Sequence, residues 1–506
     1  MAGDESAPPA ETPSPPAPPP SLASKAASGV VWTVALTFVA RAVSMLVNII
    51  VTRYVTPADY GEVQGAAVLA ATAASISSLG LGAYLVAHPK EGQETTWHVT
   101  FLGTAGCALL LGILLVFQVP IGHAFKLTDV GHYLPILAAA TLIERAGMPM
   151  EKLLMRQFRY RPLGIISGIA ELMYAASTFL IVVSGYGAIG IAIANLFRTG
   201  FKFITFTFLV KRHEWLTVGP LEWKRIERMF RFGIPLTIAG VADFISRRWD
   251  NMMTSRYFGA GLMGSYNIAY NLSDIPNEMI AERAGDALLP AFSHLEGERR
   301  FWGLVRAMKL LALILYPLAI GLALVADPLV RAVFDERWRA IGPMLSVLCG
   351  ITLSRPLSYA TAIYLQSLSQ THLLPAFEIS KTLLMLLLLS ILGPIGPTWA
   401  CGAVVATFTI HTFVILAFVG RRTVSIGALL VAPIRPLLAC LPMVAAVLGL
   451  RHLVPSLVAG PAWQQLACEI GLGAVVGIAS LFVIARAIAD DFLGLMGTML
   501  RRRRKA

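Results

Sequence analysis

The sequence predicts an all-α polytopic membrane protein of about 14 transmembrane helices, with two six-helix lobes in a parallel repeat and two extra C-terminal helices. Of the 506 residues, 56% are hydrophobic and 14% are charged, and the mean hydropathy is +0.69. Apolar stretches of about 20 residues, long enough to cross a bilayer as a helix, recur along the chain. One segment near the start also recurs in the second half. A soluble protein of this length does not need so much apolar surface.

Residues 1–24 precede the first span and are rich in Pro, Ala and Ser. Such a segment cannot bury a core, so we expect a disordered, cytoplasmic, Pro-rich tail. It has neither the basic start nor the cleavage site of a signal peptide. The predicted spans, of which the eighth is the most polar, lie near residues 29–51, 62–86, 98–119, 133–153, 163–184, 188–210, 232–254, 262–288, 302–325, 341–366, 372–392, 397–419, 428–450 and 465–488.

The internal repeat consists of residue pairs that share one offset of 203 positions. They are Asn48/Asn251, Arg53/Arg256, Tyr54/Tyr257, Gly61/Gly264 and Ala66/Ala269. Six spans separate the two copies, so both halves have the same orientation, and such repeats bind their substrate between halves that rock against each other. The predicted order is an N-terminal lobe at 25–210, a basic cytoplasmic linker at 211–231, a C-terminal lobe at 232–419, helices 13 and 14 at 420–490, and a basic cytoplasmic tail at 491–506.

Loop charges orient the predicted spans. With a cytoplasmic N-terminus, the inner loops and tails carry 22 Lys and Arg residues and the outer loops carry seven. The outer seven are Arg53, Lys126, Arg256, Arg331, Arg337, Arg339 and Arg451. This positive-inside bias predicts that both termini are cytoplasmic, with the final basic run held on anionic lipid.

Eight cations lie deep inside predicted spans, where each costs roughly 2.5–3.5 kcal/mol unless it faces water or a counter-charge. They are Arg41, Arg198, Lys202, Arg247, Arg248, Arg283, Arg355 and Lys381. We interpret them as the lining of a polar, positively charged cavity, and the natural cargo of such a cavity is an anion.

Some of these cations have acidic neighbours and others have none. Arg41 has no acidic residue within one helical turn, and Arg198 shares a helix face with Lys202, so an anion between that pair would relieve their repulsion. Arg355 is more isolated in the sequence. Two pairs, Asp243/Arg247 and Glu378/Lys381, have the spacing to neutralise each other, and this alternative stays open.

An acidic stripe follows the eighth span, with Asp274, Glu278, Glu282 and Asp286 spaced four residues apart. Together with Asp243, these carboxylates suggest coupling to H⁺ or Na⁺. The alternative, which we favour, is that the stripe balances Arg283 and the arginines of facing spans. Five cysteines without CxxC spacing and scattered histidines give no metal site, and we expect no other cofactor.

The segments Arg53-Tyr-Val-Thr-Pro-Ala-Asp-Tyr-Gly61 and Ser78-Leu-Gly-Leu-Gly-Ala-Tyr-Leu85 resemble the amino-terminal signature of bacterial Wzx-type polysaccharide flippases. These belong to the multidrug/oligosaccharidyl-lipid/polysaccharide exporter superfamily. The resemblance implies transport of an undecaprenyl-diphosphate-linked oligosaccharide across the inner membrane, through a cationic cavity, for O-antigen, capsule or exopolysaccharide assembly. It also implies that Arg41 and Arg247 approximate the cavity arginines of the family by their spans.

Three other functions are alternatives. A lipid II flippase differs only in substrate, whereas a MATE-type drug or cation antiporter needs cavity carboxylates, which the excess of intramembrane arginine disfavours. A membrane-embedded polymerase or glycosyltransferase needs a large outer loop or an acidic catalytic motif. Without a Walker A sequence or a supported nucleophile–base pair, we predict no enzyme activity.

The expected partners are the lipid-linked glycan, membrane lipid and a polysaccharide polymerase or co-polymerase, with no nucleic acid. We expect a monomeric transporter.

Overall fold

The computed structural model describes residues 43–44, 46–88, 93–157, 159–220, 222–422 and 425–503. The predicted tail at 1–24, most of the first span and Arg41 lie outside the described residues. Within those ranges the regular structure is helical and contains no strand, which confirms the all-α class.

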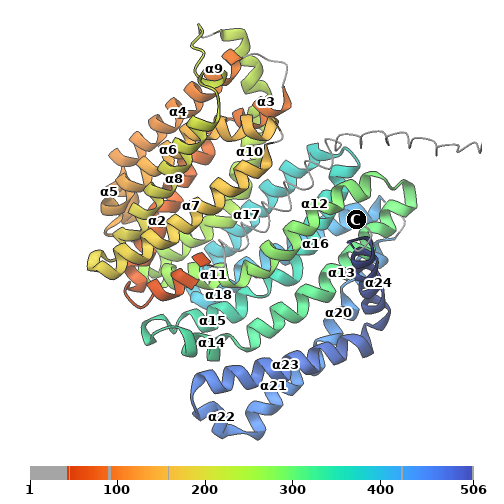
Figure 1. Cartoon of the computed structure of the whole chain (residues 1–506). Helices are drawn as coiled ribbons and strands as arrows, with labels where there is room; N and C mark the ends of the chain where they lie inside the picture. The colour runs from red at the N-terminus through yellow and green to blue at the C-terminus, as the bar shows by residue number, and fades with distance from the viewer. Residues whose placement is uncertain are drawn as a thin grey trace, which may run out of the picture.

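The N-terminal half of the fold supplies the first wall of the site. Its helices are α2 (Pro57–Ile76), α3 (Leu81–Ala87), α4 (Gln93–Val116), α5 (Gln118–Phe125), α6 (Val130–Arg156), α7 (Tyr160–Ile181), α8 (Ile189–Leu209) and α9 (Arg212–Trp215). α6 packs on α2, α4 and α8, and α7 packs on α8. These helices lie close together (Figure 1), and their buried residues form one cluster largely within this half and another that is shared with the second half.

The second half begins with one long helix and continues through shorter ones. They are α10 (Trp223–Phe258), α11 (Ala260–Pro276), the π-helix η2 (Asn277–Ala281), α12 (Glu282–Ser293), α13 (Gly297–Leu324), α14 (Ala326–Val333), α15 (Ile341–Leu348), α16 (Ile351–Ser367), α17 (Leu374–Leu392) and α18 (Pro397–Arg421). α10 packs against both α2 and α17, so it contacts both halves.

The remaining helices are α19 (Ile426–Val431), α20 (Ile434–Ala439), α21 (Leu441–Leu453), α22 (Pro455–Ala459), α23 (Ala462–Ile484) and α24 (Arg486–Arg503). Four of them, α20, α21, α23 and α24, contact α13. α21 and α23 pack on each other and contact α13, and Figure 1 shows them as a layer at the edge of the molecule.

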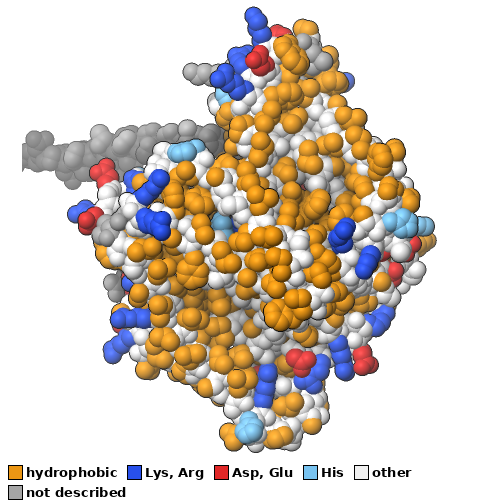
Figure 2. Space-filling model, turned by 180° about the vertical axis from the view of Figure 1, so that it is seen from behind, with side chains coloured by type: hydrophobic (Ala, Val, Ile, Leu, Met, Phe, Trp, Pro, Cys, Tyr) orange, Lys and Arg blue, Asp and Glu red, His pale blue; other side chains and the backbone are white. Residues whose placement is uncertain are grey.

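Nine helices in the described part of the chain are long and apolar enough to cross a membrane, or up to eleven if two bent pairs each count as one span. Both pairs, α2 with α3 and residues 336–348 with α16, bend by 47°. Predicted spans four and eight are absent from this set because they are more polar. Hydrophobic side chains cover much of the face in Figure 2, as expected for contact with lipid. The total of 14 spans stays a prediction.

The Thr-Pro segment that carries the family resemblance starts α2. Thr56 is the N-cap, and its Oγ1 accepts a hydrogen bond from the backbone N–H of Asp59 at 3.2 Å and donates one to Asp59 Oδ2 at 2.7 Å. Pro57 occupies the first helical position, where its missing N–H is not needed. The motif therefore fixes where the second span begins.

The repeat appears in the structure as a contact between α2 and α11 (Figure 1). A Cβ atom on Gly61 would lie 1.9 Å from the carbonyl oxygen of Ala260, and a Cβ atom on Gly264 would lie 2.2 Å from that of Pro57. The two contacts interchange under the offset of 203 residues, because Ala260 is the counterpart of Pro57. This symmetry supports the predicted duplication, and only glycine permits so close an approach.

Candidate functional site: the cavity between the two halves

A cavity of about 270 Å³ lies where the two halves meet. Its lining comes from residues of the first half, Ser44, Asn48, Ile49, Thr52, Tyr60, Glu171 and Tyr174, and from residues of the second half, Arg248, Ile268, Asn271, Leu272, Ile275 and Phe334. Hydroxyl, amide and charged groups alternate with apolar ones around it. In transporters built from two repeats, the substrate site lies at the interface of the two halves, and this cavity has that position.

Arg248 is the cation that α10 presents to this cavity. Its side chain is exposed and makes no ion pair with any described residue. The nearby Asp250 is fully buried and is held by other groups, since its carboxylate accepts hydrogen bonds from Tyr266 Oη at 2.7 Å and from the Asn251 N–H at 2.8 Å. Arg248 therefore lines the cavity without an ion pair to any described residue.

Arg198 lies behind the cavity wall rather than in the cavity lining. Its Nη1 is 3.0 Å from Glu171 Oε1, its Nη2 donates to Asn195 Oδ1 at 2.8 Å, and its guanidinium lies 5.2 Å from the centre of the Tyr174 ring. Glu171 and Tyr174 do line the cavity. The structure thus places Arg198 where it orients two wall residues.

Lys202 lies away from the cavity. Its Nζ is 3.7 Å from Glu151 Oε2, and it lines a separate small gap between α6 and α8. Arg198 and Lys202 share a face of α8, but each has its own carboxylate from a different neighbouring helix. Their mutual repulsion is therefore reduced without a bound anion.

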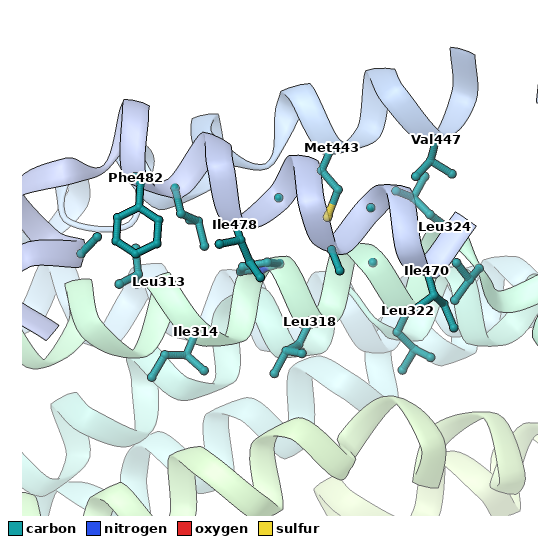
Figure 3. A pocket seen from close by; sticks show the side chains of 18 of the residues that line it. Leu313, Ile314, Leu318, Leu322, Leu324, Met443, Val447, Ile470, Ile478 and Phe482 are labelled. Carbon is teal, nitrogen blue, oxygen red and sulfur yellow. The ribbon is translucent and has the colours of Figure 1, made fainter. Parts of the chain in front are cut away.

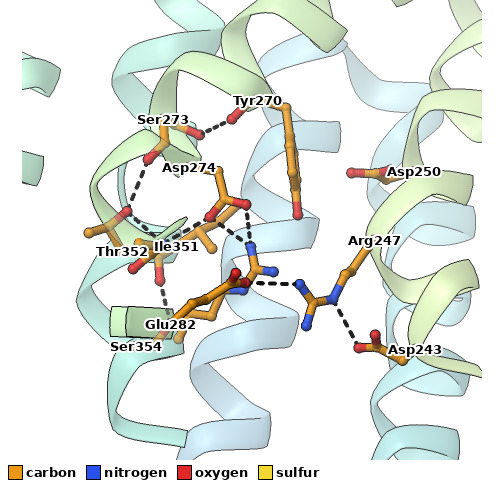
Figure 4. A network of polar contacts seen from close by, with 12 residues as sticks. Asp243, Arg247, Asp250, Tyr270, Ser273, Asp274, Glu282, Ile351, Thr352 and Ser354 are labelled. Atoms are coloured by element: carbon orange, nitrogen blue, oxygen red, sulfur yellow. Dashed lines mark hydrogen bonds and ion pairs between the residues drawn. The ribbon is translucent and has the colours of Figure 1, made fainter. Parts of the chain in front are cut away.

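The second half contains a network of paired charges between α10, α12 and α17. Arg247 Nε lies 3.0 Å from Asp243 Oδ1, and Arg247 Nη1 lies 3.5 Å from Glu282 Oε1 (Figure 4). The buried Lys381 ammonium lies 3.6 Å from Asp243 Oδ1 and also pairs with Glu378. The local neutralisation that the sequence left open for both pairs is present in the structure.

Arg355 is not isolated in the folded chain. Its Nη1 donates to both carboxylate oxygens of Asp274, at 2.7 and 2.6 Å, and the two side chains are only 11% and 12% exposed. Asn277 also donates to Asp274, at 3.1 Å. The partner is 81 residues away in the sequence, so the neighbours of Arg355 along its own helix gave no sign of it.

Two of the four carboxylates of the acidic stripe pair with arginines of facing helices, which agrees with part of the alternative that we favoured from the sequence. Asp274 pairs with Arg355 of α16, and Glu282 pairs with Arg247 of α10. Arg283 is exposed and takes no part in an ion pair among the described side chains. Glu278 lies on the π-helical turn η2, and the Asp286 side chain lies outside the described residues.

Comparison with known proteins identifies the chain. Residues 50–343, more than half of its length, match the family described as polysaccharide biosynthesis protein. The chain belongs to this family. It is 26% identical over 302 residues to the succinoglycan biosynthesis transport protein ExoT of Rhizobium meliloti, a match that covers 59% of this chain and 60% of that protein, less than two thirds of its length. It is 22% identical to the lipopolysaccharide biosynthesis protein WzxC of Escherichia coli, covering 72% of this chain and 75% of the relative.

Solved structures show the same fold. The lipid II flippase MurJ, in an inward closed conformation, superposes with a TM-score of 0.73 at 16% identity, covering 91% of this chain and 100% of MurJ. An inward-facing multidrug resistance MATE transporter of the MOP superfamily superposes with a TM-score of 0.62 at 15% identity, covering 76% and 95%. The family match confirms the predicted resemblance to membrane proteins of polysaccharide biosynthesis, and the solved structures show the fold.

Sequence reasoning missed several residues of the cavity in this polysaccharide biosynthesis protein. Glu171 and Tyr174 of α7 and Asn271 of α11 line it, yet only intramembrane cations and one acidic stripe were singled out. Glu171 is a lone carboxylate inside the predicted fifth span. A search for every intramembrane charge of either sign would have found it.

This protein also has an apolar groove of about 620 Å³ between α13 and the α21–α23 layer (Figure 3). Leu318, Met443 and Ile478 are among the side chains that face it. Its one charged lining residue, Glu469, is satisfied by Arg451, whose Nε and Nη2 lie 2.8 and 2.7 Å from the carboxylate oxygens. The groove therefore offers a nearly continuous hydrocarbon surface.

Proposed function

We propose that this protein flips an undecaprenyl-diphosphate-linked oligosaccharide from the cytoplasmic to the periplasmic leaflet of the bacterial inner membrane, for the assembly of a surface polysaccharide. The observation that carries the proposal is the cavity between the halves with the uncompensated Arg248. An anionic head group that enters this cavity gains charge-assisted hydrogen bonds, which are stronger in a partly dehydrated site than in water.

The membrane-embedded charges then have two different tasks. Arg248, with Arg41 and Arg283 as further candidates, binds the diphosphate. Arg247, Arg355 and Lys381 are balanced by four carboxylates in the contacts described above. These pairs hold α10 to α12 and α17, and α16 to α11, as the second half moves. Arg198 acts on the cargo through Glu171 and Tyr174.

The prenyl tail stays in hydrocarbon while the head group crosses. The apolar groove beside α13 supports this division, because its lining is almost entirely hydrophobic and suits an isoprenoid chain. The predicted helices 13 and 14, at residues 420–490, would then bind the prenyl tail. The cavity would bind the diphosphate and the sugars.

Coupling to H⁺ or Na⁺ is proposed at Asp243. This carboxylate contacts two cations, Arg247 and Lys381, from two helices, so a change in its charge would alter the contact between α10 and α17. Asp274, Glu278 and Glu282 are the other candidates. Both termini are placed in the cytoplasm by the loop charges, and a monomer that hands its product to a polymerase fits this role.

The direct test is the fate of lipid-linked glycan in cells that lack the gene and are complemented with wild type or Arg248→Ala. Accumulation of undecaprenyl-diphosphate oligosaccharide on the cytoplasmic side, corrected by wild type and not by Arg248→Ala, is the expected result. A matched control is Arg228→Ala, an exposed residue on the same helix far from the cavity lining.

Other outcomes identify the rival functions. Accumulated lipid II in place of oligosaccharide would make the protein a peptidoglycan precursor flippase. Unchanged glycan export with altered sensitivity to cationic drugs would place it with the MATE-type antiporters. In either case the oligosaccharide assignment would be wrong.

A further inference from the structure

A third cavity, of about 420 Å³, lies at the ends of α13, α19, α20 and α24. Its lining residues are Trp302, Val305, Arg306, Lys309, Val431, Ala432, Arg435, Ala487, Ile488 and Asp491. None of these lines the cavity between the halves or the apolar groove. The proposed transport step therefore does not account for this pocket.

Its charges do not balance. Arg306 and Lys309 are three residues apart on α13, and Arg435 is on α20. The single carboxylate, Asp491 of α24, is taken by Arg306, whose Nε and Nη2 lie 2.7 and 2.5 Å from its two oxygens. Lys309 and Arg435 make no ion pair in the described part of the chain. Two positive charges thus face the pocket without a counter-ion.

The surroundings of the pocket are those of a membrane surface. The charge bias of the loops assigns this end of the molecule to the cytoplasmic side. Trp302 is 48% exposed at its rim, as is typical of a residue at the lipid–water boundary. Val305, Ala432 and Ile488 supply apolar walls of the same pocket.

We propose that this pocket binds the phosphate head group of an anionic phospholipid from the cytoplasmic leaflet. Basic pockets between membrane helices on this side suit such head groups, and the apolar walls suit the start of the acyl chains. Lys309 and Arg435 contact the phosphate, while the Arg306–Asp491 pair holds α24 as the remaining wall. The bound lipid links α20, which is part of the predicted span at 428–450, to α13 of the second half.

The test is a titration of the purified full-length protein with phosphatidylglycerol, phosphatidylcholine or inorganic phosphate, with bound lipid counted by native mass spectrometry. The test variant is Lys309→Gln/Arg435→Gln. Its matched control is Lys224→Gln/Arg299→Gln, which removes one Lys and one Arg that are exposed on the same predicted side and lie outside the pocket. Arg435→Gln alone is a second variant, and because Arg435 is exposed, the fold does not depend on it.

Wild type and the control are expected to bind one phosphatidylglycerol at least about tenfold more tightly than the test variant does, and phosphatidylcholine equally weakly in all. Equal affinity for phosphatidylglycerol in the test and control variants would overturn the proposal. So would saturation by inorganic phosphate at the same concentration, which would indicate a soluble anion. Displacement of phosphatidylglycerol by a polyprenyl diphosphate would also overturn it, because the occupant would then be the cargo. None of these readouts requires flipping.

Discussion

Gly80 and Gly233 bring the backbones of the two halves into direct contact, at the end of the molecule that the loop charges assign to the cytoplasmic side. A Cβ atom on Gly80 would lie 2.4 Å from Gly233 Cα, and a Cβ atom on Gly233 would lie 1.8 Å from the carbonyl oxygen of Leu79. Gly80 also has φ +61°, which glycine adopts without strain. With the Gly61–Gly264 contact at the predicted outer end, the chain from α2 to α3 touches the second half through glycine at both ends.

These contacts predict how a larger side chain at one end of the interface changes access to the cavity. Gly233→Val should separate the inner ends of α2 and α10, because backbone atoms cannot move aside as a flexible side chain does. The test introduces one cysteine in the cavity, Asn271→Cys, into a protein whose Cys468 is replaced by Ser. In Gly233→Val, a thiol reagent added on the cytoplasmic side should label this cysteine faster. Gly240→Val is the matched control, since no atom lies within 4 Å of its added Cβ. Equal labelling of the two variants would show that the glycine contact does not gate the cavity.

The outer contact makes the opposite prediction. Gly264→Val should push α11 from α2 and speed the labelling of Asn271→Cys by an impermeant reagent added outside. Gly261→Val is its control on the same helix, where the nearest atom to a Cβ is 3.9 Å away. Faster labelling from the cytoplasmic side in Gly264→Val would contradict the predicted topology.

The sequence predicted the class, the order of helices and the repeat because these follow from local hydropathy and from residue identity at a fixed offset. Partners across helices were not predictable in the same way. Arg355 looked isolated because Asp274 is on another helix, and Arg198 looked like a cargo ligand because Glu171 is on another span. A position inside a span shows that a charge needs a partner, but the identity of the partner depends on helix packing.

The Asp274–Arg355 pair predicts a large effect on stability. Replacing one partner, as in Arg355→Gln, leaves a nearly buried carboxylate unpaired and should lower the free energy of unfolding by about 3–5 kcal/mol. The double variant Asp274→Leu/Arg355→Met should recover most of that loss, because two apolar groups leave no charge unpaired. Thermal unfolding of the purified protein measures both. A double variant as unstable as the single would show that the pair is not the source of the effect.

The last prediction concerns Arg198 and separates a wall residue from a cargo ligand. Arg198→Ala should abolish glycan export with normal expression, because it frees the Glu171 carboxylate inside the cavity that contains Arg248, where it competes with an anionic cargo. Removing that charge should then restore export, so Glu171→Gln/Arg198→Ala is expected to be more active than Arg198→Ala. The pair Glu151→Gln/Lys202→Ala, which lies outside the cavity, should keep near-normal export. If Arg198 itself binds the diphosphate, adding Glu171→Gln will not restore export. Arg198 would then be a cargo ligand and not a residue that positions the cavity wall.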